Sequence, residues 1–165
     1  DYAENPEGDT IYYSVKRPLT WADFRDGVMD DAFQAEVFTS IGYTEKMAVS
    51  KGVVILDIAL KVDLPKSDCL VKPGGRDDYA LNHEQRHFDI AKIVAERFKH
   101  KILAMQLPVD DYDGPIDMQY FETLRELTAM QKRYDNETRH GLDRAMQAEW
   151  DKKIDQELKT DGIKN

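Results

Sequence analysis

Residues 53–64 read Val-Val-Ile-Leu-Asp-Ile-Ala-Leu-Lys-Val-Asp-Leu, and this stretch decides the fold of the first half of the chain. Every second residue from Val54 to Leu64 is apolar, and the charged residues of the stretch occupy the alternate positions. Because successive side chains of a strand point to opposite faces of a sheet, the pattern predicts a half-buried antiparallel strand. Pro65 ends the pattern, and Ser50-Lys51-Gly52 predicts a turn before it.

Two further stretches ahead of this strand alternate in the same way. Residues 10–15 and 35–44 each place apolar or aromatic side chains at every second position, which predicts two more strands. Residues 1–9 are polar and contain a proline and a glycine, so we expect a loose arm there. Pro73-Gly74-Gly75 interrupts the chain after the strands and separates a β half from a helical half.

Apolar residues in the second half recur at steps of three and four, which is the spacing of an amphipathic helix. The pattern predicts a long helix over residues 79–105, capped by Asp77 or Asp78, and two more helical stretches behind it. Tyr134-Asp135-Asn136 and Gly141 predict a kink or short loop between those two stretches. We therefore predict one α+β domain over residues 1–165, in which an antiparallel sheet from the N-terminal half packs on long helices of the C-terminal half in a zincin-like arrangement.

Composition narrows the classes of function. A formal net charge of −9 over 165 residues argues against nucleic-acid binding, which needs a concentrated basic surface. No run approaches the roughly 18 apolar residues of a membrane-spanning helix, so no transmembrane segment is predicted. The single cysteine, Cys69, excludes an intrachain disulfide and a cysteine-rich zinc finger. The chain opens with Asp1 and carries no signal peptide, so we expect a processed or trimmed form.

The residues that carry chemistry are His83-Glu84-Gln85-Arg86-His87. Positions i and i+4 of a helix lie on one face, so the imidazoles of His83 and His87 can reach the same metal ion. Metal coordination lowers the pKa of water from 15.7 to about 7, and a glutamate at the position of Glu84 can take the proton from that water. The alternative is that both histidines are core residues that bind nothing, and the helix phase, which continues from them into the buried stripe, favours the metal site.

A catalytic zinc site needs a third protein ligand besides the two histidines. His100 is excluded because thirteen helical residues after His87 span roughly 20 Å at 1.5 Å per residue. His140 lies at the predicted break and can fold back toward the motif, so it is the favoured third ligand, with Glu137 as the competing one. Tyr134 from the same segment is a candidate to stabilise an oxyanion, with a packing role in the core as the alternative.

These segments together resemble a known family. Residues 81–90, read with Tyr134-Asp135-x-x-Thr138-x-His140-Gly141, are similar to the bacterial DUF922 group, which is described as predicted secreted zinc-dependent proteases. Leu19-Thr20-Trp21-Ala22-Asp23-Phe24 and the stretch from Gln147 to Trp150 are similar to that group as well. The resemblance implies zinc binding by three histidines, which would be His83, His87 and His140, and a general base, which would be Glu84.

We therefore predict a zinc-dependent metallopeptidase that acts on a peptide or protein substrate in the periplasm or outside the cell. Glu84 and Tyr134 are the predicted catalytic residues, and His83, His87 and His140 are the predicted zinc ligands. Two alternatives stay open: a zinc-binding or interaction domain without catalysis, and a zinc amidase that cleaves cell-wall amide bonds. The sequence does not predict an oligomeric state.

Overall fold

The protein is described by a computed structural model over residues 8–30 and 32–165, so the arm expected at residues 1–9 lies almost wholly outside the described residues. The strands are β1 (Thr10–Tyr12), β2 (Arg25–Asp26), β3 (Ala35–Glu36), β4 (Ser40–Ser50), β5 (Val53–Pro65) and β6 (Leu70–Val71). The helices are α1 (Asp78–Leu103), α2 (Asp113–Thr138) and α3 (Arg144–Thr160), with short 3-10 turns η1 (Trp21–Asp23) and η2 (Lys66–Asp68). This confirms the predicted α+β class, and the zincin-like arrangement stays a prediction.

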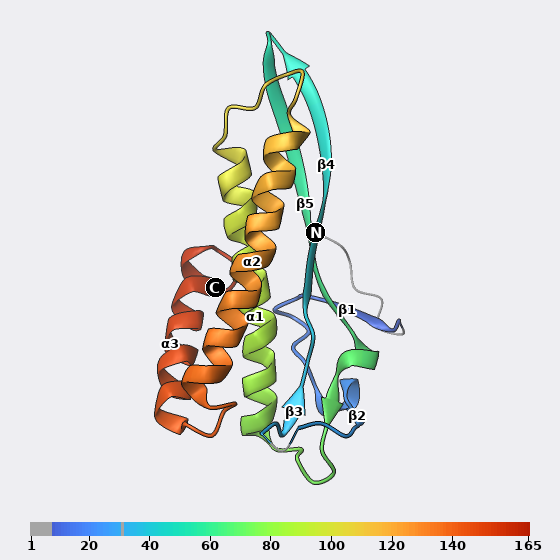
Figure 1. Cartoon of the computed structure of the whole chain (residues 1–165), viewed down its shortest axis with the longest axis vertical. Coiled ribbons are helices and arrows are strands. Elements are labelled where there is room, and N and C mark those ends of the chain that lie inside the picture. The colour runs from blue at the N-terminus through green and yellow to red at the C-terminus, as the bar shows by residue number, and fades with distance from the viewer. Residues whose placement is uncertain (1–7, 31) are drawn as a thin grey trace.

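The strand that alternates most clearly in sequence, β5, is the middle strand of an antiparallel sheet with the order β1-β5-β4. Strands β4 and β5 pair along their whole length, from Ser40 opposite Asp63 to Ser50 opposite Val53. Lys51 and Gly52 close this hairpin with positive φ angles of 52° and 74°. The hairpin projects beyond the ends of α1 and α2 (Figure 1).

A second, smaller sheet lies beside the first turns of α1. Its order is β2-β6-β3, with β3 antiparallel to β6 and β2 parallel to β6. The strand predicted over residues 35–44 is therefore divided, because β3 belongs to this small sheet and β4 to the long hairpin. Residues 37–39, which join the two, cross from one sheet to the other.

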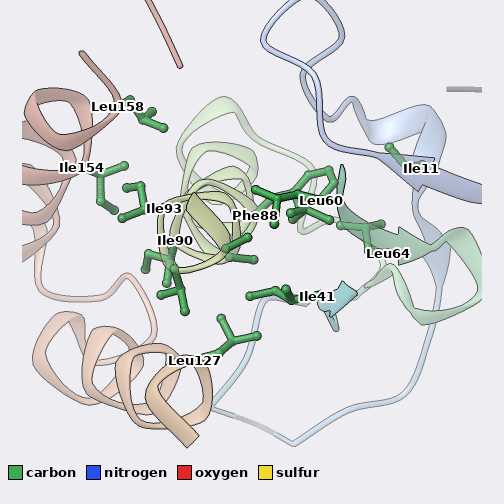
Figure 2. Packing of buried hydrophobic residues seen from close by; sticks show 14 of the residues in the cluster. Ile11, Ile41, Leu60, Leu64, Phe88, Ile90, Ile93, Leu127, Ile154 and Leu158 are labelled. Atoms are coloured by element: carbon green, nitrogen blue, oxygen red, sulfur yellow. The ribbon is translucent and has the colours of Figure 1, made fainter. Parts of the chain in front are cut away.

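Helix α1 is the centre of the fold, between the long sheet and the other two helices (Figure 1). It begins where the Asp77 side chain accepts a hydrogen bond from the Ala80 N–H, as the capping pattern predicts. Figure 2 shows the resulting core: Phe88 and Leu60 lie between α1 and β5, and Ile154 and Leu158 of α3 approach α1 from the opposite side.

Helix α2 continues through the break that the sequence predicts. It ends at Thr138, and the left-handed residues Arg139, His140 and Gly141 follow with φ angles of 52°, 54° and 82°. A break between the two helices is thus confirmed at Gly141, but it does not include Tyr134-Asp135-Asn136, since burial of Tyr134 outweighs the weak helix propensity of its two neighbours. Among the described residues, no helix combines the length and apolar content needed to cross a membrane.

Candidate metal centre

His83 and His87 lie one turn apart on α1 and face Asp135, which α2 contributes. The Nε2 atoms of His83 and His87 lie 3.2 Å and 2.9 Å from the same carboxylate oxygen, Oδ1 of Asp135. All three side chains offer one ligand atom, and these atoms lie within 4.8 Å of one another. Both histidines are buried. The group His83, His87 and Asp135 can therefore hold a metal ion.

The other nitrogen of each imidazole faces the amide oxygen of a glutamine. The Nδ1 of His83 lies 2.8 Å from Oε1 of Gln147, and the Nδ1 of His87 lies 2.5 Å from Oε1 of Gln131. Gln147 donates through its amide nitrogen to the carboxylate of Asp151, and Gln131 donates to the backbone carbonyl of His87. Carboxylate and carbonyl oxygens only accept hydrogen bonds, so each glutamine must direct its oxygen at the imidazole.

These contacts place a proton on the Nδ1 of each imidazole, so the neutral form of each ring is the Nδ1–H tautomer. With the proton on Nδ1, each Nε2 presents a lone pair toward Asp135. A lone pair this close to a carboxylate oxygen is unfavourable unless a proton or a cation lies between them. Without a cation, a second proton on Nε2 of His87 meets this need: burial lowers the pKa of His87, but the hydrogen bond to Asp135 and the charge of Glu84 outweigh burial and raise that pKa to about 8. A metal ion would take the place of that proton. The donor set thus fits a metal ion, with each ligating imidazole oriented by a partner on its far nitrogen.

The carboxylate of Asp135 is the negatively charged group that contacts both imidazoles. Burial raises the pKa of this carboxyl, but its contacts with His83 and His87 outweigh burial and hold the pKa well below its usual range. The carboxylate is therefore ionised at neutral pH, which is the form that binds a metal. The local sequence around Asp135 predicts a break in the helix and gives no sign that this residue is a candidate ligand.

Glu84 is buried next to both histidines on α1 and lines the same cleft. Burial raises the pKa of its carboxyl, whereas the neighbouring His87 and His83 lower it. The net effect is a raised pKa, and a buried carboxyl at this position can accept a proton from a neighbouring water and release it again.

His140 borders the centre from the turn after α2. Its Nδ1 is 3.8 Å from Oδ2 of Asp135, and this buried nitrogen has no hydrogen-bond partner among the described residues. The ring packs against Phe33, with centroids 4.3 Å apart. Gly141 follows with φ +82°, and a Cβ built on it would lie 3.3 Å from Nδ1 of His83. The His-Gly pair therefore brings one imidazole to the centre and lets the backbone pass close to another.

Tyr134 lies beneath the two histidines and is fully buried. Its ring stacks on His83 at a centroid distance of 4.7 Å, and its hydroxyl donates to the backbone carbonyl of His83. The same hydroxyl accepts a hydrogen bond from the amide nitrogen of Gln147. In this arrangement the phenol supports α1 and Gln147 from within the core.

Glu137 does not reach the metal centre. Its carboxylate accepts hydrogen bonds from Arg133 and from the indole nitrogen of Trp150. Two residues along a helix turn the side chain by about 200°, so Glu137 and Asp135 project from nearly opposite sides of α2.

The centre opens into a cleft of about 560 Å³. One wall is the extended segment 33–39, which includes β3, and the other is formed by α1, α2 and the turn before α3. Glu36 contributes a further carboxylate, whose pKa is raised by burial and by the charge of Asp135. The exposed part of the lining combines the apolar side chains Phe38 and Leu142 with polar and charged ones such as Lys132 and Arg144.

Comparison with known proteins adds one family. No curated protein and no solved structure matches the chain. The region from the N-cap of α1 to Gly141 does match a family model, and it contains the two histidines, Asp135 and His140. Over residues 77–141 the chain thus resembles DUF922, described as a bacterial protein of unknown function, which confirms the resemblance predicted from its motifs.

Proposed function

We propose that residues 1–165 form a single metallohydrolase domain that binds zinc and hydrolyses peptide bonds. The observation that carries this proposal is the convergence of the Nε2 atoms of two imidazoles on one carboxylate oxygen, with Glu84 in the same cleft. Two nitrogens and one oxygen from three side chains are a ligand set typical of catalytic zinc, which keeps one position open for water or substrate.

Each residue has a role in this proposal. Zinc, when bound, supplies Lewis-acid activation of water and of the scissile carbonyl. Glu84 takes a proton from the attacking water and delivers it to the amine that leaves as the C–N bond breaks. Gln131 and Gln147 keep His87 and His83 in the tautomer that presents Nε2. The cleft between segment 33–39 and α1 receives the substrate.

The third ligand is assigned to Asp135, with His140 as the competing assignment from the sequence. The contact of Asp135 Oδ1 with both Nε2 atoms supports the first, and the buried, unpartnered Nδ1 of His140 supports the second. Elemental analysis of purified Asp135→Ala and His140→Ala distinguishes them. If Asp135 is the ligand, its variant loses stoichiometric zinc and the His140 variant retains it.

Catalysis is tested with the conservative variant Glu84→Gln. The amide keeps the shape of the carboxyl but cannot take a proton, so zinc content should stay at the wild-type value while peptide cleavage falls by at least about a hundredfold. Cleavage is measured by mass spectrometry on an unstructured peptide library. Equal cleavage by wild type and variant would contradict the proposal.

Two other outcomes correspond to the remaining alternatives. A wild-type protein that binds one zinc ion but cleaves neither peptides nor cell-wall fragments is the binding domain without catalysis. Release of amines from muropeptides, with no cleavage of linear peptides, identifies the cell-wall amidase. The periplasmic or extracellular location is part of the proposal and is tested by fractionation of cells that express the full gene.

A further inference from the structure

The end of the molecule opposite the metal centre is formed by three segments. The turn of the β4–β5 hairpin, the loop between α1 and α2, and the first turns of α2 all lie at one end of the long axis (Figure 1). The hydroxyl of Tyr120 donates to the Ile41 carbonyl at 2.6 Å, and the hydroxyl of Tyr43 donates to Asp117 at 3.3 Å. These contacts hold the hairpin and α2 in a fixed relation.

The hairpin tip, residues 46–56, is apolar on both faces and basic. Met47 and Val49 are exposed on one face, and Val53 and Ile55 are exposed on the other, at 37% to 63%. The register assigns these faces, since Met47 pairs with Leu56 while Ala48 pairs with Ile55. Lys46 and Lys51 are the only charged residues in the tip, and both are exposed; Asp57, which pairs with Lys46 in the register, lies just outside the tip, so Lys51 carries the unopposed charge of the tip.

The neighbouring surface is apolar and acidic. Residues 102–124 contain no lysine or arginine. Four aspartates of this segment are exposed, and so are five of its large apolar side chains. The aspartates are Asp110, Asp111, Asp113 and Asp117, and the apolar residues are Leu103, Met105, Val109, Met118 and Phe121. We call residues 103–121 the acidic surface.

We propose that the hairpin tip and the acidic surface form a self-complementary interface for a second copy of this chain. A two-fold axis would set the basic tip of each copy against the acidic surface of the other, so every contact would occur twice. Exposed apolar side chains on the hairpin tip and on the acidic surface would be buried in the dimer. The opposite charges favour contact between the tip of one copy and the acidic surface of the other.

A second copy fits this end better than a lipid bilayer does. The four exposed aspartates oppose an anionic membrane surface. Strand β4 is an edge of its sheet, and among residues 8–30 and 32–165 β5 pairs on its other side only with β1 near Pro65, so the described tip has open edges along both strands. Hydrocarbon cannot satisfy the backbone groups of such edges, whereas a protein partner can.

Sedimentation equilibrium of the full chain over a concentration series tests the interface. The wild type should show a reversible monomer–dimer equilibrium. Lys46→Glu/Lys51→Glu and Asp110→Lys/Asp111→Lys should each raise the dissociation constant at least about tenfold, because each homodimer then sets like charges against one another. Lys152→Glu/Lys159→Glu, on the exposed side of α3, is the control and should leave the equilibrium unchanged.

Mixing the two charge-reversed variants gives the sharpest result. In the mixed pair, the acidic tip of one copy meets the basic surface of the other, and the two unchanged parts still attract. The mixture should therefore regain a dimer of about wild-type affinity, although each variant alone dimerises at least about tenfold more weakly. A wild type that stays monomeric throughout, or a dimer that neither reversal weakens, would overturn the proposal. The zinc content of each variant should not depend on dimerisation, since the metal centre lies at the other end of the molecule.

Discussion

The Nδ1 of His83 lies 2.8 Å from Oε1 of Gln147, although 64 residues separate the two in sequence. Gln147 is itself buried, and its amide nitrogen donates to Tyr134 and to Asp151. Helix α3, which contributes no ligand, is thereby connected to the metal centre through one side chain. The orientation of His83 depends on a residue that the local sequence around the HExxH motif does not contain.

Replacing Gln147 with leucine should weaken zinc binding about 10- to 100-fold, which is the usual effect of removing a hydrogen-bond partner from a metal-ligating histidine. Leucine has a similar volume but cannot accept the Nδ1–H of His83, so the imidazole loses its preferred tautomer. The measurement is competition for zinc against a chelating dye at constant pH.

Gln156→Leu is the matched control for this variant. Gln156 lies on the same helix and is exposed, and its side chain makes no hydrogen bond among the described residues. Its zinc affinity should equal that of the wild type. An unchanged affinity in Gln147→Leu would show that the tautomer of His83 is fixed by something else.

Local patterns were sufficient for the elements that carry the centre. The alternation of residues 53–64 predicted β5, and the apolar spacing after Asp77 predicted α1 with both histidines on its core side. In each case one face of the element is buried, so the spacing of apolar residues in the sequence predicts whether the element is a strand or a helix and which face is buried. The same patterns could not divide residues 35–44 between two sheets, since both parts alternate alike.

Residues that act across the fold could not be predicted in this way. Gln131 and Gln147 contact histidines that lie 44 and 64 residues away, and a glutamine on a helix gives no local sign of such a partner. Asp135 was assigned to a break because aspartate and asparagine are weak helix formers. The packing of Tyr134 against His83 and Trp150 keeps the helix intact there and directs Asp135 at the centre.

Tyr134→Phe separates two roles for the phenol. If the hydroxyl supports His83 and Gln147, its loss leaves buried polar groups without a partner, and the free energy of unfolding should fall by about 1–3 kcal/mol, with weaker zinc binding. If it stabilises an oxyanion, kcat should fall while zinc affinity and KM stay unchanged. Urea unfolding, zinc competition and steady-state kinetics on one preparation distinguish these results.

The ion pair between the half-buried Arg17 and the buried Asp23 should make the free energy of unfolding depend on pH in the acid range. The guanidinium donates to both carboxylate oxygens, at 2.7 Å and 2.6 Å. Burial raises the pKa of Asp23, but the bonds from Arg17 and Thr20 outweigh it and lower that pKa. The pKa of Asp23 is therefore lower in the folded protein than in the unfolded chain, where it is about 3.9. This difference stabilises the fold at pH values above about 3.9, and the stabilisation is lost as the pH falls through the folded pKa.

Arg17→Met should therefore destabilise the protein by about 2–3 kcal/mol at pH 7, because it leaves a buried carboxylate without its partner, and by much less at pH 3. Urea unfolding at both pH values measures the difference. Arg76→Met is the control, since Arg76 and Asp26 form a similar contact at 2.7 Å but are exposed. That variant should change stability by less than about 0.5 kcal/mol at either pH. Equal losses for Arg17→Met at both pH values would contradict the role of Asp23.

Gly141→Ala combines backbone strain with crowding at the metal centre. At φ +82° any side chain is strained, and the added Cβ would lie 3.3 Å from Nδ1 of His83. Gly162→Ala supplies the strain alone, since φ is +66° there and nothing lies within 4 Å of its Cβ. Both variants should lose about 1–2 kcal/mol of unfolding free energy, because alanine is unfavourable at positive φ. Only Gly141→Ala should also lose zinc affinity, because the crowding displaces His83 from Gln147. Equal zinc affinities in the two variants would mean that the close approach of Gly141 does not position His83.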